Sequence, residues 1–341
     1  MKIIAEPKLD FNNVLIRPKR TTLNSRSQVD LEREMTFPHS PLKWKGVPII
    51  SANMDTTGTL RVYQILSQYK IITALHKFYN LDDLKGEKLN SDFFMISTGI
   101  TDNDFKRLSN ILDNLEVKWI CVDVANGYMQ RLVDFCRRIR ENYPDKIIVA
   151  GNICTREMAE ELIINGKVDV CKAGIGGGSG CLTRSQTGVG MPQLSCIMEC
   201  ADACHGVNGY VISDGGITCP GDMAKAFGGG ADFVMMGGQF AGHDENPGEV
   251  MEENGQKYKL FYGMSSELAM KKHYGKMEKH RSSEGRVIKI KYKGSLEETV
   301  LNYLGGLRST CTYINAKKIK HISKCTTFIM VSQQLNNSLI K

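Results

Sequence analysis

GYVISDGGITCPGDMAKAFGGGADFVMMGG, residues 209–238, holds one complete unit of a pattern that the chain repeats. An apolar run (209–215) is followed by a helix-type segment, GDMAKAFGGG, and then by a second apolar run (232–238). Both runs are continuously apolar rather than alternating, which is typical of strands buried on both faces of a parallel sheet. The helical segment ends in a glycine-rich stop. The stretch therefore predicts two parallel strands joined by a helix.

The same pattern occurs repeatedly before this stretch. Most of the apolar runs are separated by segments of helical periodicity, such as TREMAEELIING. The eight runs lie near residues 47–51, 71–75, 93–97, 118–123, 146–151, 168–174, 209–215 and 232–238. Eight strands with intervening helices favour an α/β fold of the (β/α)8 barrel type. An open doubly wound sheet is the alternative, but no G-x-G-x-x-G opens a helix after the first strand.

Polar side chains gather at the points where these strands end. The residues in question are Asn53, Asp55, Lys77, Asp123, Asn126, Asn152 and Asp214. In a (β/α)8 barrel the carboxyl ends of all strands meet at one rim, which is where active sites of this fold lie. Structural turns alone would explain some of the glycines there, but not so many polar groups at one topological position.

The segment GIGGGSGCLTR (174–184) follows the sixth strand and places Cys181 at this rim. A cysteine in a tight glycine-rich turn near helix N–H groups can have a lowered pKa, and its thiolate is a nucleophile. A buried structural cysteine is an equally open interpretation. Thr183 could relay a proton if it had a carboxylate partner, and Glu284 in RSSEG (281–285) is the candidate.

Two glycine pairs follow the seventh and eighth strands, where barrels of this type commonly bind phosphate. Gly215 and Gly216 come after Asp214, and Gly237 and Gly238 end the eighth run. Glycine lets backbone N–H groups approach an anion closely. Ser179 is a further candidate phosphate donor, and the neighbouring carboxylate suits ribose hydroxyls. Together these features predict a nucleotide rather than a simple phosphate ester.

Length and composition predict one domain over residues 1–341, with a lead-in, a C-terminal tail and an excursion over 239–292 that we expect to be an ordered lid. No apolar run is long enough to span a membrane and no secretory signal is evident, so a cytoplasmic protein is expected. The 11 cysteines form no CxxC pair, and Cys196, Cys200 and Cys204 should lie buried on one helix face. The net charge of +7 comes without any nucleic-acid-binding motif, so its basic patches suggest small anionic ligands instead.

Longer motifs show a family resemblance over essentially the whole chain. GIGGGSGCLTRSQTGVGMPQLS (174–195) and the segment around ISDGG (212–216) resemble the IMP dehydrogenase/GMP reductase family. LDFNNVLIRPKR (9–20), LFYGMSS (260–266) and LGGLRSTCTY (304–313) resemble its GMP reductase branch. Only a helix separates VPIISANMD from IITALHK, which leaves no room for the regulatory CBS modules of many IMP dehydrogenases.

The resemblance implies reduction of GMP by NADPH to IMP, ammonia and NADP+. Cys181 would add to C2 of the purine, and Thr183 with Glu284 would protonate the departing ammonia, leaving a thioimidate. A thiol adduct is needed because an amide-like purine carbon is a poor hydride acceptor. The family also implies a homotetramer.

The resemblance assigns ligand contacts as well. GMP would be held by Ser179, Asp214, Gly215, Gly216, Gly237, Gly238, Gly263, Met264, Ser265, Arg281, Ser282, Ser283, Glu284 and Gly285. The cofactor would meet Lys77, Asp123, Val124, Ala125, Ile175, Gly176, Met264, His280, Arg281, Ser309, Thr310, Cys311 and Thr312, with Ser25 and Arg26 reaching it from a neighbouring subunit. A monovalent cation, typically potassium, would sit on the carbonyls of Gly176, Gly178, Cys181 and Arg184.

The chain departs from the family pattern inside the cysteine loop. Gly177, Gly180 and Leu182 stand where other residues are usual, and the additional glycines could loosen the cation site. Two other functions stay open. One is an IMP dehydrogenase without regulatory modules, which would need an Arg-Tyr pair that is missing from 239–292. The other is a non-catalytic nucleotide-binding relative, which retention of the cysteine, threonine and glutamate disfavours.

Overall fold

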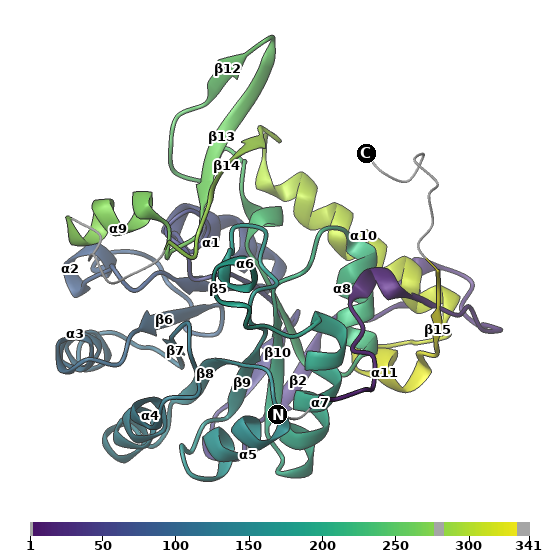
Figure 1. The fold of residues 1–341 in the computed structure, drawn as a ribbon, viewed down its shortest axis with the longest axis horizontal. Helices are drawn as coiled ribbons and strands as arrows, with labels where there is room; N and C mark the ends of the chain where they lie inside the picture. Colours follow the sequence, from purple (N-terminus) through teal and green to yellow (C-terminus); the bar gives the residue numbers. More distant parts are fainter. Residues whose placement is uncertain (1–2, 276–282, 333–341) are drawn as a thin grey trace.

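The computed structural model describes residues 3–275 and 283–332. Eight parallel strands form a closed barrel in the order β10-β11-β4-β5-β6-β7-β8-β9 (Figure 1). They are β4 (Ile49–Ser51), β5 (Ile72–Leu75), β6 (Phe94–Thr98), β7 (Trp119–Asp123), β8 (Ile147–Ile153), β9 (Val170–Ala173), β10 (Tyr210–Asp214) and β11 (Phe233–Met236). The predicted (β/α)8 barrel is confirmed, and each strand lies within the apolar run that predicted it, with overhangs of one or two residues at β6 and β8.

Helices pack around the outside of the barrel, and all of them except the last, α10, connect consecutive barrel strands. They are α1 (Leu60–Leu66), α2 (Leu81–Leu84), α3 (Asp102–Leu112), α4 (Gln130–Asn142), α5 (Arg156–Ile164), α6 (Thr183–Thr187), α7 (Gln193–Gly206), α8 (Pro220–Gly228) and α10 (Leu296–Tyr313). Local sequence sets their starts. Thr101, for example, caps α3 by accepting a hydrogen bond from Asp104 N, while the Asp104 side chain accepts one from Thr101 N. The helices bury one face against the sheet, and Cys196, Cys200 and Cys204 of α7 are all fully buried, as predicted.

A hairpin closes the amino-terminal end of the barrel. It consists of β2 (Arg33–Thr36) and β3 (Lys43–Gly46). Trp44 packs edge-on against Trp119 at 5.9 Å between ring centroids, and it also contacts Phe233 at 5.3 Å. Trp119 and Phe233 are the first residues of their strands, so the aromatic plug fills the amino-terminal end of the barrel. The carboxyl-terminal rim is thereby left as the end that can receive ligands.

The segment after β11 is ordered over most of its length. Following a short 3-10 turn (Gly238–Phe240), it forms an antiparallel sheet of β12 (Met251–Glu253), β13 (Gln256–Tyr262) and β14 (Val287–Lys291). α9 (Glu267–Tyr274) leaves this sheet and is capped by Ser266. In Figure 1 the sheet projects away from the barrel, while α9 lies across its side beside α2.

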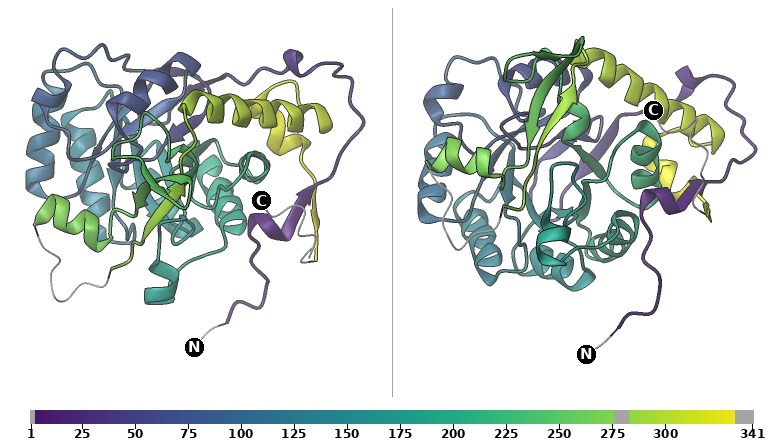
Figure 2. Two further views of the ribbon diagram at one scale, coloured as in Figure 1. Left: turned by 90° about the horizontal axis from the view of Figure 1, so that it is seen from above. Right: turned by 45° about the horizontal axis from the view of Figure 1, so that its top comes forward.

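One strand from near each end of the chain forms a small sheet on the other side of the molecule from α9. β1 (Val14–Ile16) pairs with β15 (Phe328–Met330) after α11 (Ile322–Cys325). Both views of Figure 2 show the purple lead-in, residues 3–30, running around the outer end of α10. The described part of the chain contains no helix long and apolar enough to cross a membrane.

Candidate active site

The three predicted catalytic residues form one hydrogen-bonded chain. The Cys181 thiol donates to Thr183 Oγ1 at 3.1 Å, and the Thr183 hydroxyl donates to Glu284 Oε2 at 2.7 Å. Glu284 is 101 residues from Thr183 in sequence, so only the folding of the insertion over the rim brings them together. All three side chains are partly exposed and therefore within reach of a ligand.

The direction of these hydrogen bonds defines what the chain can do chemically. Each donor points toward the carboxylate, so a proton leaving Cys181 can pass through Thr183 to Glu284. A threonine hydroxyl is too weak a base to hold that proton, whereas a carboxylate can hold it and return it. The arrangement can thus produce a thiolate nucleophile and store the proton for a leaving group.

Backbone contacts fix the cysteine loop to the insertion. Leu182 N donates to the Glu284 carbonyl at 2.6 Å, and Arg286 N donates to the Gly180 carbonyl at 3.0 Å. A Cβ on Gly263 would lie 2.6 Å from the Gly180 carbonyl oxygen, which is closer than a side chain tolerates. Gly180, unusual for the family pattern, therefore lies where two backbones meet. A Cβ on Gly180 itself would lie 3.2 Å from Gly263 N and from the Phe261 ring, so the loop and the insertion leave little room for a side chain there.

The predicted phosphate-binding glycines also converge. Gly215 and Gly216 have φ values of 103° and 79°, a left-handed conformation that favours glycine. A Cβ on Gly238 would lie 2.5 Å from Ser179 Oγ, so the cysteine loop and the second glycine pair are in contact. Lys293, which the sequence did not single out, donates to the Gln239 carbonyl at 3.1 Å beneath this turn. Burial lowers the pKa of Lys293 to about 8.

Two rim carboxylates share a buried lysine that the sequence analysis missed. Lys172 Nζ lies 2.6 Å from Asp123 Oδ1 and 3.2 Å from Asp214 Oδ2. Asn152 Nδ2 donates to Asp214 Oδ2 at 2.8 Å. The sequence does contain a signal for this pairing, because Lys172 is a single lysine inside an otherwise apolar strand. A charged side chain is almost never buried in such a strand unless it is paired.

One group of the residues predicted to contact the ligands lies near this network and near α9. The Lys77 ammonium lies 5.8 Å from the Tyr274 ring centroid, and Met264 Sδ accepts from Asp55 N at 3.4 Å. Val124 bonds through its backbone to Gly151 and Asn152. Ile175 is buried, whereas Ala125 and Ser265 are exposed. The Ser283 hydroxyl donates to the Gly285 carbonyl. His280, Arg281 and Ser282 lie outside the described residues.

The other predicted cofactor residues lie elsewhere. Arg26 begins a 3-10 turn capped by Ser25, and this turn packs against α10, which contains Ser309, Thr310, Cys311 and Thr312. Lys19 N donates to the Tyr313 carbonyl at 2.9 Å, which ties the lead-in to the end of that helix. Figure 2 places this end of α10 on the opposite side of the molecule from α9. The structure thus groups Ser309–Thr312 with Ser25 and Arg26, not with Lys77, and Cys311 is fully buried there.

The carbonyls predicted to hold a cation belong to one segment, residues 176–184, which runs from the glycine loop into α6. The Gly178 carbonyl accepts from Cys181 N at 3.0 Å, and the Arg184 carbonyl accepts from Gly188 N at 3.0 Å. Gly176 has a φ of 81° and packs against the Arg184 side chain. A carbonyl oxygen has two lone pairs, so each engaged group can still contact a potassium ion. The backbone donor set therefore fits a hard monovalent cation.

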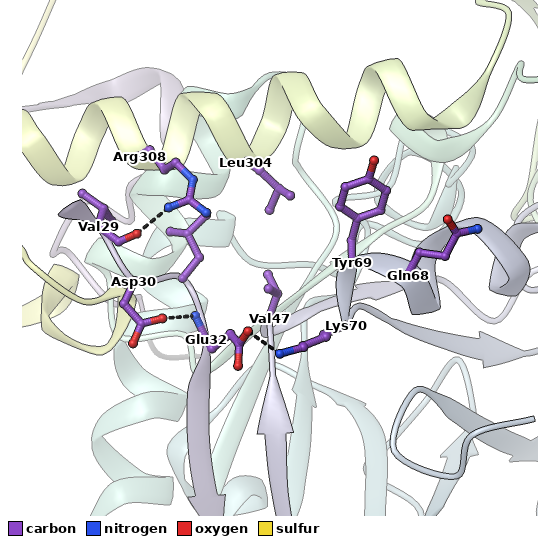
Figure 3. Close-up of a pocket in the computed structure, with 10 residues that line it drawn as sticks. Val29, Asp30, Glu32, Val47, Gln68, Tyr69, Lys70, Leu304 and Arg308 are labelled. Carbon is purple, nitrogen blue, oxygen red and sulfur yellow. Dashed lines mark hydrogen bonds and ion pairs between the residues drawn. The ribbon is translucent and has the colours of Figure 1, made fainter. Parts of the chain in front are cut away.

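A separate cavity of about 250 Å³ opens at the amino ends of β4 and β5 (Figure 3). Its charged groups are satisfied by the protein itself. Lys70 binds Glu32 at 2.6 Å, and Arg308 donates to the Val29 carbonyl. None of the predicted site residues lines it. The candidate active site is therefore the opposite rim, around Cys181.

Comparison with known proteins agrees with the geometry of this rim. A sequence model described as "IMP dehydrogenase / GMP reductase domain" matches residues 8–337. The chain is 54% identical to GMP reductase 1 of Mus musculus, with 98% of each chain covered. It is 52% identical to GMP reductase of Caenorhabditis elegans, over 99% of this chain and 96% of the relative. It is 53% identical to GMP reductase of Escherichia coli O157:H7, over 98% of each.

Proposed function

The chain belongs to the IMP dehydrogenase/GMP reductase family, and we propose that within it the chain acts as a GMP reductase. The reaction is the NADPH-dependent reductive deamination of GMP to IMP and ammonia. The observation that carries this proposal is the hydrogen-bonded chain from Cys181 through Thr183 to Glu284. A non-catalytic nucleotide-binding relative would have no need for a thiol aligned with a proton acceptor.

The chemistry begins with the thiol. Cys181 passes its proton through Thr183 to Glu284 and forms a bond from Sγ to C2 of the purine. Glu284 then returns a proton through Thr183 to the exocyclic nitrogen of this adduct, the C2–N bond breaks, and ammonia leaves, so that the purine remains attached to Cys181 as a thioimidate. NADPH supplies the hydride that reduces C2. The carbon–sulfur bond then breaks, Cys181 recovers its electron pair as a thiolate, and IMP is released.

The substrate is held by groups on both sides of the thiol. Asp214 accepts from the ribose hydroxyls, while backbone N–H groups of Gly215 and Gly238 and the hydroxyl of Ser179 bind the phosphate. The pair Gly237–Gly238 opens a 3-10 turn, and the left-handed turn at Gly215 and Gly216 is fixed by a hydrogen bond from Gly216 N to the Gly177 carbonyl at 2.9 Å. The purine would then lie over Cys181, next to the insertion backbone at Gly263–Ser265.

The cofactor is bound at two places. Lys77 and Asp123–Ala125 would meet its nicotinamide half near Cys181. Ser25, Arg26, Ser309, Thr310 and Thr312 form one surface on the far side of the same chain, above the buried Cys311, so we propose that this surface binds the adenosine half of a cofactor seated in a neighbouring subunit. Such an arrangement requires an oligomer, and a homotetramer is the assembly that we propose.

A potassium ion on the carbonyls of Gly176, Gly178, Cys181 and Arg184 would fix the turn that carries the thiol. This part of the proposal is tested by exchanging potassium for lithium at constant ionic strength. Lithium is too small to be contacted by all four carbonyls, so kcat should fall while the protein stays folded.

The proposed activity is tested by following NADPH loss spectrophotometrically with GMP, and NAD+ reduction with IMP. We expect NADPH oxidation that depends on GMP, with IMP and ammonia formed in equal amounts. An IMP dehydrogenase would instead reduce NAD+ with IMP, although residues 239–292 lack the Arg-Tyr pair that this activity would need. Folded protein that binds GMP but leaves NADPH unchanged would contradict the proposal.

A further inference from the structure

Lys172 is a buried cation at the centre of the rim. It is the third residue of β9, in a stretch of the barrel whose other residues are apolar, and its side chain is only 2% exposed. Its ammonium lies within reach of Asp123, Asp214 and Asn53, the last at 3.4 Å. Burying an ammonium group is unfavourable unless it is paired. These partners therefore account for a lysine in this position.

The chain makes room for this side chain at one specific place. Gly151 of β8 lies beside Lys172 in the strand register. A Cβ on Gly151 would lie 2.6 Å from the Lys172 Cβ and 2.5 Å from its carbonyl oxygen. Any larger residue at 151 would collide with the stem of the lysine. Gly151 thus allows β8 and β9 to approach closely at the position of Lys172.

The network extends over four consecutive strands of the barrel wall. Asp123 ends β7, Asn152 lies in β8, Lys172 in β9 and Asp214 ends β10. Asn152 donates both to Asp214 and to the Gly174 carbonyl, each at 2.8 Å. The two carboxylates are thereby connected through side chains that the barrel holds in fixed positions.

The charges in this network support one another. Burial opposes the charge of Lys172, but Asp123 and Asp214 outweigh it and raise the pKa of Lys172. Burial likewise opposes ionisation of Asp123, but Lys172 outweighs it and lowers the pKa of Asp123. The other titratable groups facing the network are Cys121, whose pKa burial raises to about 12, and Lys77, which further favours ionised Asp123. Asp123 is therefore charged at neutral pH.

The carboxylates remain available to ligands although the lysine is not. The side chains of Asp123 and Asp214 are 35% and 22% exposed, respectively, in contrast to the buried ammonium beneath them. Under the proposed function, Asp214 binds the ribose of GMP and Asp123 lies on the cofactor side. Lys172 therefore touches one group from each half of the site without being able to touch either ligand.

We infer that Lys172 is a positioning residue that couples the two halves of the site, because it fixes Asp214 for the nucleotide and Asp123 for the cofactor. This inference rests on the proposed function for the identity of the two ligands. Without the ammonium, two carboxylates face each other with no cation between them, and one of them takes up a proton near neutral pH. A protonated Asp214 is a poorer acceptor for ribose hydroxyls.

The test uses Lys172→Met, which keeps the stem and removes the charge. We expect KM to rise about tenfold for both GMP and NADPH, with a smaller change in kcat, a size typical of coupling between sites. KM for GMP should also become pH-dependent, rising as the pH falls from 8 to about 6, where the wild-type value stays level. A purely structural defect would not produce this pH profile.

A second variant separates charge from packing. In Lys172→Met/Asp123→Asn the repulsion between the carboxylates is gone, so KM for GMP should return toward the wild-type value while KM for NADPH stays high. The double variant also keeps the test valid if Lys172→Met alone does not fold. Lys259→Met is the matched control, since Lys259 is also buried but bonds to the Asn246 carbonyl at 2.8 Å, away from both carboxylates. It should lose stability with both KM values unchanged.

Calorimetric titration of GMP and of NADPH separates this inference from the proposed function. If wild-type protein shows no GMP-dependent NADPH oxidation, the proposed function fails, yet binding of each nucleotide still reports on Lys172. Unchanged affinity for both ligands in Lys172→Met would overturn the inference, as would weakened binding of only one. Failure of the double variant to recover GMP binding would overturn it equally.

Discussion

At the scale of single residues, the polarity of the catalytic chain is its most informative property. The Cys181 thiol donates to Thr183 and the Thr183 hydroxyl donates to Glu284, so both hydrogen bonds let a proton move toward the carboxylate. The threonine is the only member with no other chemical role, since it neither attacks the substrate nor stores the proton. Its hydroxyl should therefore matter to turnover much more than to substrate binding.

Thr183→Val tests this directly, because valine keeps the shape and removes the hydroxyl. We expect kcat to fall by about 10²-fold or more, the usual contribution of a positioned proton-transfer group, while KM for GMP changes little. Thr187→Val is the control, since Thr187 lies one turn further along α6, where its hydroxyl donates to the Thr183 carbonyl at 2.7 Å and accepts from Val189 N at 3.0 Å. Steady-state kinetics of both variants would show the difference. Equal kcat values for the two would contradict the relay.

At the scale of elements, one carboxylate fastens the insertion to the barrel. Asp55, which follows β4, accepts from Tyr262 at 2.9 Å, from Lys272 at 2.8 Å and from His273 at 2.7 Å. His273 also stacks on Phe78, with ring centroids 3.6 Å apart. Burial opposes ionisation of Asp55, but the hydrogen bonds from Lys272 and His273 outweigh it and lower its pKa. α9 is thereby held beside Lys77.

Asp55→Asn should lower stability by about 1–3 kcal/mol at neutral pH, because Lys272 and His273 lose a charged acceptor. A carboxyl whose pKa is lowered on folding contributes stability above its unfolded pKa and loses it as the pH falls through its folded pKa. The difference in Tm between wild type and variant should therefore be full at pH 7 and shrink below about pH 4. Asp102→Asn, which affects an exposed pair with Arg138, should change Tm little at either pH. A Tm difference that grows in acid would refute this account.

The barrel strands were predictable from the sequence, whereas the contacts between the barrel and the insertion were not. Continuous apolar runs identified all eight barrel strands, because burial on both faces leaves a strong local signal. Contacts of Asp55 with Lys272 and His273 were not predictable, since more than 200 residues separate the partners and no local pattern records the pairing. Lys172 was missed for a related reason. Its role depends on two carboxylates from other strands.

At the scale of the whole molecule, the arrangement of the cofactor residues has consequences for assembly. Ser25 and Arg26 lie beside the end of α10, on the side of the barrel away from α9. The family resemblance assigns Ser309–Thr312 to the cofactor. Only the fold shows that this run lies beside Ser25 and Arg26. A complete cofactor site would then take Cys181 from one subunit and Arg26 from another.

Co-expression of two inactive variants tests this arrangement. Cys181→Ala lacks the nucleophile, and Arg26→Glu places a negative charge where the phosphorylated cofactor would bind. Mixed oligomers should regain part of the activity, because some sites combine an intact Cys181 with an intact Arg26. Activity that stays absent in mixed oligomers, confirmed by differently tagged subunits, would mean that each site is built from one chain.

The central claim is that Cys181 is the nucleophile in the reduction of GMP. The most direct measurement is the rate of IMP formation by Cys181→Ala at saturating GMP and NADPH, with GMP affinity determined on the same sample by calorimetry. Because Asp214, Ser179 and the glycine pairs are untouched, GMP should bind with nearly unchanged affinity, and no IMP should form above background. IMP formation at a rate comparable to wild type would contradict covalent catalysis at this residue.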